Sequence, residues 1–174
     1  RKDSRADVLW DEAAQNMYVV SQIWSGSGSA ASTGQRGELF RYSYSGGVYT
    51  LDSGFPVEVS DGSSEAMVIE KDSSGMLWVT YVMDRKVRVN HSQNGDDADW
   101  VGSYVLPVGS AADVDSDDLS SVVAYDGHIG VMWSSQTGGN NMYFAVHADD
   151  TDPNTWQIVE AYAASGDDHI NLKS

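Results

Sequence analysis

The feature that most constrains this chain is a strand pattern that recurs about every fifty residues. It is clearest between Ser63 and Pro107, where apolar or aromatic runs alternate with turns rich in Gly, Asn, Asp and Ser. The runs cover residues 66–71, 76–82, 87–91 and 100–106. Runs and turns of this kind predict four consecutive antiparallel strands. One four-stranded sheet per repeat of about fifty residues is typical of a β-propeller blade.

The same pattern precedes and follows this stretch. First strands end at Asp11, Asp72 and Asp126, and fourth strands open at Tyr49, Trp100 and Trp156. The segment 117–122, which opens the third copy, recurs fifty residues later as 167–172. The sequence therefore predicts an all-β chain of three four-stranded antiparallel blades and the first strand of a fourth. The expected blades cover 6–59, 64–108 and 118–164, with a stub at 167–174, as one propeller portion over 1–174.

An arc of blades leaves apolar faces bare at its two ends, and repeat arrays need their ends covered. We therefore expect this chain to belong to a six- or seven-bladed ring, completed by further blades of the same longer chain or by other copies. The tryptophans at repeated strand positions, Trp78 and Trp133, are expected to pack between blades.

Composition excludes several functions. The net charge is −16, from 26 acidic and 10 basic residues, and such a chain is repelled by nucleic-acid phosphates and anionic membranes. No apolar run is long enough to insert into a membrane as a helix. With no cysteine, neither a disulfide framework nor a thiol nucleophile exists, which fits an exported protein. The expected location is secreted or at the cell surface.

The turns between third and fourth strands carry a family resemblance. Sialidase-like propellers have "Asp boxes" there, of the form Ser-x-Asp-x-Gly-x-Thr-Trp. The stretch from Ser92 to Trp100 resembles such a box, with Asn94 at the Asp position, and Thr155-Trp156 resembles its end. The resemblance implies an exported β-propeller that binds, and in catalytic members hydrolyses, glycans at the mouth of its central channel.

The family's catalytic arginines do not carry over. Phe55-Pro56 only partly resembles the Phe-Arg-Ile-Pro stretch of sialidases, and the arginines of this chain do not match the family's arginine triad. Two functions therefore stay open. One is a glycan-binding and hydrolysing propeller, and the other is a non-catalytic extracellular interaction scaffold. Whether the chain is an enzyme is left undecided.

Carboxylates near first-strand starts are the candidate catalytic groups. Glu65, Asp118 and Asp168 occupy this place in consecutive blades, where they would face one another across the channel mouth. Two carboxyl groups about 5–9 Å apart suit glycoside hydrolysis. His169 would serve as a base or a sugar-binding donor beside Asp168. The alternative is that these acids cap strand entrances and that His169 is structural.

Loops between second and third strands lie on the same side of a propeller as the connections between blades. They supply the candidate substrate-binding residues, namely Trp24, Arg36, Arg85, Asn140 and Asn141. Trp24 would stack on a sugar ring, and the others would hydrogen-bond to it. His91 and His147, which end third strands, are interpreted as structural parts of the repeat.

No metal or organic cofactor is predicted, although calcium stays open. Asp113, Asp115 and Asp117 have the spacing that begins an EF-hand loop, but Asp118 stands where that loop needs Gly and Ala124 where it needs Glu. A looser calcium site is the remaining alternative. No cluster of His and Cys indicates zinc, and no Gly-rich loop indicates a nucleotide. The expected partner is a glycan or polysaccharide.

Overall fold

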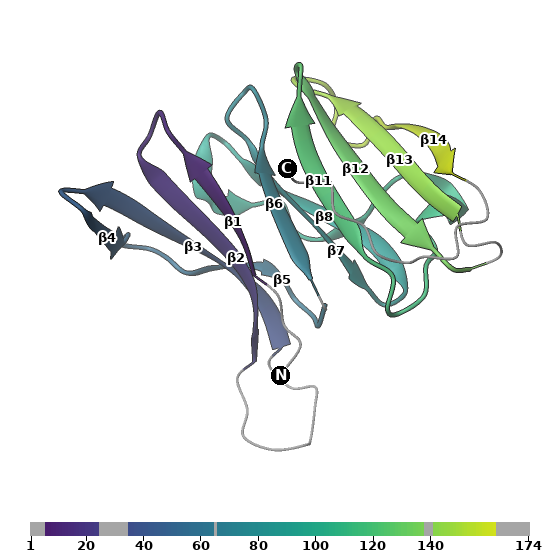
Figure 1. Cartoon of the computed structure of the whole chain (residues 1–174), viewed down its shortest axis with the longest axis horizontal. Coiled ribbons are helices and arrows are strands. Elements are labelled where there is room, and N and C mark those ends of the chain that lie inside the picture. Colours follow the sequence, from purple (N-terminus) through teal and green to yellow (C-terminus); the bar gives the residue numbers. More distant parts are fainter. Residues whose placement is uncertain (1–5, 25–34, 65, 138–140, 163–174) are drawn as a thin grey trace.

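The structure is a computed structural model, and it describes residues 6–24, 35–64, 66–137 and 141–162. Three antiparallel sheets follow one another along the chain and fan out side by side, from purple and blue through teal to green and yellow (Figure 1). The described part also has one turn of 3-10 helix, Gly109–Ala112. None of the described segments forms an apolar helix long enough to cross a bilayer.

In each sheet, strands pair mainly with their sequence neighbours. Sheet one contains β1 (Ala6–Asp11), β2 (Asn16–Trp24), β3 (Gln35–Ser45), β4 (Val48–Leu51) and β5 (Val57–Ser60). Sheet two contains β6 (Met67–Lys71), β7 (Leu77–Met83), β8 (Lys86–Gln93), β9 (Asp96–Trp100) and β10 (Tyr104–Val105). Sheet three contains β11 (Ser120–Tyr125), β12 (His128–Ser135), β13 (Asn141–Ala148) and β14 (Gln157–Tyr162).

The all-β, antiparallel prediction is confirmed, and the three sheets are consistent with blades. The sheets do not close into a ring, so the number of blades in a complete propeller stays a prediction. The connections 61–66 and 106–119 join one sheet to the next, close to the expected blade boundaries.

Two of the predicted fourth strands are each split in two. In sheet one, β4 and β5 both pair with β3, and the gap between them contains Gly54, at a φ of 89°, and Pro56, which has no N–H for a ladder. In sheet two, β9 and β10 both pair with β8, and the gap contains Gly102 at a φ of 106°. Left-handed glycines bend the chain out of the ladder, so these strands contact β3 and β8 in two short pieces.

The predicted polar turn from Ser92 to Asp99 is wrong. Strand β8 continues to Gln93, and β9 begins at Asp96. The turn is only Asn94-Gly95, with φ of 58° and 66°. Asn-Gly with both φ angles positive is a preferred two-residue hairpin turn, because its twist matches that of the paired strands. Asp99 completes the hairpin by accepting hydrogen bonds from the side-chain amides of Gln93 and Asn94, both at 2.9 Å.

Sheet two is buried on both faces. Every residue of β7 is buried, and its side chains alternate between two apolar cores. Leu77, Val79 and Tyr81 pack against sheet one, in a core with Tyr18, Val20 and Leu39. Trp78 and Val82 pack against sheet three, in a core with Val122, Ile129, Val131 and Trp133. Trp78 and Trp133 are 1% and 0% exposed, and both lie in the core between sheets two and three, which is consistent with the expected packing between blades.

Candidate functional site: a cavity where sheet connections meet a hairpin

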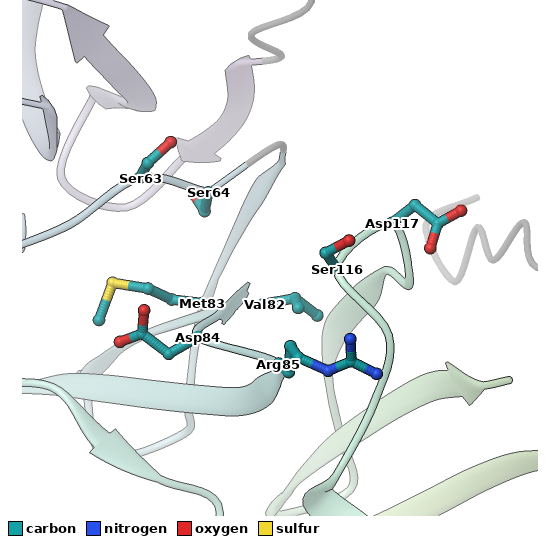
Figure 2. Close-up of a pocket in the computed structure, with 8 residues that line it drawn as sticks. All are labelled: Ser63, Ser64, Val82, Met83, Asp84, Arg85, Ser116 and Asp117. Atoms are coloured by element: carbon teal, nitrogen blue, oxygen red, sulfur yellow. The ribbon is translucent and has the colours of Figure 1, made fainter. Parts of the chain in front are cut away.

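A polar cavity of about 300 Å³ lies where the connections between sheets meet the β7–β8 hairpin. Its walls come from the connection between sheets one and two, the β7–β8 hairpin, and the connection between sheets two and three (Figure 2). The lining residues are Ser63, Ser64, Val82, Met83, Asp84, Arg85, Ser116 and Asp117. A propeller layout places these segments on one face, and the structure brings Arg85, a predicted substrate-binding residue, together with Asp84 and Asp117 there.

The β7–β8 hairpin aims Arg85 at the cavity. Its two turn residues, Asp84 and Arg85, have φ angles of 54° and 60°, which few residues other than glycine adopt. The following connection is fastened to this turn: Val114 N–H donates to the Arg85 carbonyl at 3.0 Å, and Arg85 pairs with Asp115. The Arg85 side chain extends toward the loop of Ser116 and Asp117, with Ser63 and Ser64 on another wall (Figure 2). The guanidinium is therefore positioned by pairing, although its side chain stays 62% exposed.

The serine wall is held by sheet one. The side-chain oxygen of Gln22, on β2, accepts hydrogen bonds from the Ser64 N–H at 2.9 Å and the Ser64 hydroxyl at 3.1 Å. Gln22 is 7% exposed, and its side-chain N–H₂ has no hydrogen-bond partner among the described residues. Next to this wall, a Cβ added to Gly62 would lie 2.3 Å from Met83 Sδ, so a larger residue there would displace the Met83 side chain. Both sheets therefore fix the position of Ser64.

Asp118 supports the cavity from behind. It is 1% exposed, and its carboxylate accepts hydrogen bonds from Asp115 N–H at 2.6 Å, Ser134 Oγ–H at 2.9 Å and Gln136 N–H at 3.1 Å. These donors belong to the 106–119 connection and to the end of β12, so Asp118 ties that connection to sheet three. Its neighbours Ser116 and Asp117 are the ones that reach the cavity wall.

The acidic run that resembles the start of a calcium loop forms ion pairs with basic side chains of the β7–β8 hairpin. Asp113 pairs with Lys86, and Asp115 pairs with Arg85. Within the described residues, no group of three or more His, Cys, Asp or Glu side chains is arranged to hold a metal ion. The charges of this run therefore fasten the connection to the β7–β8 hairpin.

The other predicted site residues do not line this cavity. Arg36, the second residue of β3, pairs with Glu38 at 2.6 Å, and Asn141 donates to Glu160 at 2.9 Å on sheet three. Trp24 ends β2, but its side chain is outside what the structure describes. Glu65, Asn140, Asp168 and His169 lie outside the described residues. The proposed carboxylate cluster across the channel mouth therefore stays a prediction.

Sequence reasoning missed the three serines of the cavity. Ser63, Ser64 and Ser116 lie in Ser-rich connections that resemble ordinary turn residues. Only their position could have indicated them, because they lie next to Glu65 and Asp117 in connections that a propeller layout places on one face.

A second cluster of titratable groups lies between sheets two and three. His91 and His147, which are 5% and 2% exposed, both contact the Trp78 ring, with centroid distances of 4.7 and 5.0 Å. Each Nδ1 lies against a carbonyl, of Ser92 at 2.9 Å and of Thr155 at 3.1 Å, so it carries the proton. Burial, together with the nearby His147, lowers the pKa of His91 below its ordinary value, against opposing effects of the Ser92 carbonyl and Asp72. The pair matches its interpretation as a structural part of the repeat.

Comparison with known proteins adds no family: no family model matches the chain, and no curated protein does.

Proposed function

We propose that this chain is part of an extracellular, sialidase-like propeller that binds a glycan in the cavity beside Arg85. The observation that carries the proposal is the composition of that cavity. Its polar lining consists of three hydroxyls, one guanidinium and two carboxylates, and Val82 and Met83 supply apolar surface. Sugar rings present hydroxyl groups that donate and accept, together with apolar C–H faces. A pocket with convergent polar groups over an apolar patch is complementary to both.

The charges of the cavity favour a neutral sugar. Arg85 is already paired with Asp115, and the Asp84 carboxylate lies 3.8 Å from the Arg88 guanidinium, whereas Asp117 adds negative charge to the lining. A sugar that carries a carboxylate would meet this charge at short range. We therefore expect a neutral oligosaccharide to bind more tightly than its sialylated form.

Binding without hydrolysis is the form of the proposal that the described residues support best. A glycosidase needs one carboxyl group whose surroundings keep it protonated, usually through burial, next to one that is ionised. Asp84 and Asp117 are exposed, and the buried Asp118 faces protein donors rather than the cavity. The non-catalytic scaffold is the second candidate, and the same observation favours it.

The test is a titration of the 174-residue chain with N-acetyllactosamine and with sialylated N-acetyllactosamine, followed by NMR shifts of the backbone N–H signals of the lining residues Ser64, Arg85 and Ser116. The expected result is saturable shifts, larger for the neutral sugar, and their loss in Arg85→Gln. Arg36→Gln is the matched control, because it removes an arginine whose side chain is 46% exposed and lies outside the cavity. The proposal is wrong if neither sugar shifts these signals, or if both variants bind equally.

A further inference from the structure

The two ends of the sheet stack expose apolar faces that have no partner within the described structure. Sheet one turns one face to sheet two and the other outward, and sheet three does the same at the opposite end (Figure 1). Monomeric proteins rarely expose large contiguous apolar patches. These two faces therefore need an explanation.

The outer face of sheet one is aromatic. The register places Val8, Val19 and Phe40 in one row, and Trp10, Met17, Tyr42 and Leu51 in the next. Paired residues point to the same side of a sheet, so these rows share a face with Tyr44 and Tyr49. Val8 and Tyr49 are each 51% exposed, and the Trp10 ring contacts both Tyr44 and Tyr49.

The outer face of sheet three is also apolar. One row holds Met132, Phe144 and Val159, and it is flanked by Val123 and Tyr162. Val159 and Tyr162 are 58% and 61% exposed. The opposite side of the same strands supplies Val122, Val131 and Trp133 to the core shared with sheet two.

The two internal junctions show which faces pair. At each junction, a sheet packs one of its faces against the sheet that follows it in the chain. Sheet two therefore uses one face for sheet one and the opposite face for sheet three. Thus Tyr18 and Val20 pack against Leu77 and Val79, and Trp78 then packs against the sheet that carries Trp133. Among the described residues, no sheet covers the outer face of sheet three, and none covers the outer face of sheet one.

We infer that the outer face of sheet three binds the outer face of sheet one of a second copy of this chain. The contact repeats the pairing that the chain uses twice internally, so the two copies associate head-to-tail. Such an assembly forms a closed ring when the rotations from sheet to sheet add up to a full turn. The described parts of two copies supply six sheets, within the four to eight blades of known propellers. Because each copy carries a charge of −16, association strengthens as added salt screens the repulsion.

Sedimentation velocity of the 174-residue chain tests the inference. The expected result is a concentration-dependent species of twice 18.8 kDa that increases with salt. Val8→Asp and Val159→Asp each place a charge on one outer face, and each is expected to weaken association at least about tenfold. Val101→Asp is the matched control, because Val101 is 48% exposed on sheet two, away from both outer faces.

Mixing the two variants gives the sharpest result. The intact sheet-three face of Val8→Asp and the intact sheet-one face of Val159→Asp still form one head-to-tail contact, so the mixture regains dimer that neither variant forms alone. Pairing of two identical faces would leave one variant fully dimeric, and it would overturn the inference. So would a wild-type chain that stays monomeric at all concentrations and salts. If Val8→Asp loses its β-sheet circular dichroism, Tyr49→Asp serves for the same face.

Discussion

The two junctions between sheets use different chemistry on opposite faces of the same strand. Toward sheet one, β7 meets an aliphatic and tyrosine core bordered by charged bridges. Lys71 pairs with Asp11 at 2.6 Å, and Asp97 accepts from Tyr18 Oη–H at 2.6 Å and from Arg41 at 3.0 Å. Toward sheet three, the junction is a stack of aromatic rings around Trp78, in which the His147 and Trp156 ring centroids lie 5.2 Å apart.

This difference shows that stacking does not depend on one kind of contact. Each junction buries a continuous apolar core, and the polar groups at its border add register. At the first junction that register comes largely from ion pairs. At the second it comes from hydrogen bonds, such as Thr80 Oγ1–H to Ser120 Oγ at 3.0 Å and Ser73 N–H to the Asp149 carboxylate at 2.9 Å. The two junctions should therefore respond differently to truncation, loss of charge and pH.

The largest expected effect is at the ring stack. Trp78 is 1% exposed, and its indole N–H donates to Asp72 at 2.9 Å. Trp78→Ala removes a buried ring and leaves a cavity, so it should lower the free energy of unfolding by about 3–5 kcal/mol. Urea denaturation measures the loss. Trp10→Ala, at a tryptophan that is 38% exposed, is the control and should cost about 1 kcal/mol or less.

The second largest effect is expected at the junction between sheets one and two, where ion pairs join the sheets. Asp97→Asn keeps an acceptor for Tyr18 but removes the charge that Arg41 contacts. Hydrogen bonds to charged groups contribute about 1.5–3 kcal/mol, so a loss of this order is expected in urea. Asp96→Asn removes the same charge from the neighbouring residue, which contacts only Ala98 N–H in its own turn. Equal losses in the two variants would show that Asp97 does not join the sheets.

Mild acid should act on the ring stack. The folded-state pKa of His91 is lowered, mainly by burial, whereas its unfolded-state pKa is near 6.5. The unfolded state therefore binds protons first, and stability that is complete above about pH 6.5 is lost as the pH falls below it, by on the order of 1 kcal/mol. Unfolding free energies measured from about pH 7.5 to 5.5 test this. His91→Gln should flatten the slope, and His128→Gln, at a hairpin on the surface, should leave it unchanged.

The smallest effect should appear at the charged junction in stronger acid. The hydrogen bond from Lys71 is the main cause that lowers the pKa of Asp11 below its usual value. Its contribution is present above about pH 4 and is lost as the pH falls through the lowered pKa. Asp11→Asn should therefore remove a few tenths of a kcal/mol of pH dependence in that range. Glu12→Gln should not, because Glu12 contacts only its own hairpin.

Much of this arrangement could be predicted from sequence because it follows from periodicity. The recurring Asp11, Asp72 and Asp126 mark hairpins, and the uninterrupted apolar run of β7 reflects burial on both faces. The splitting of the fourth strands could not be predicted from sequence. Gly102 interrupts the hydrogen bonding to β8 only because β9 and β10, on either side of it, both stay paired with β8. The role of Asp118 was equally hidden. The sequence shows that residue 118 is an Asp, but it does not show which hydrogen-bond donors surround its carboxylate in the folded chain.

The central claim is that sheet three stacks on sheet two in the register described. The chain has no cysteine, so an introduced pair reports on this directly. Thr80→Cys with Ser120→Cys places two thiols where the oxygens lie 3.0 Å apart, and oxidation should give an intramolecular disulfide, seen as faster migration on a non-reducing gel. Thr80→Cys with Ser121→Cys is the control, because Ser121 points to the other face of β11. A disulfide is expected in the first variant alone; equal crosslinking in both variants, or none in the first, would show that sheet three does not stack on sheet two in this register.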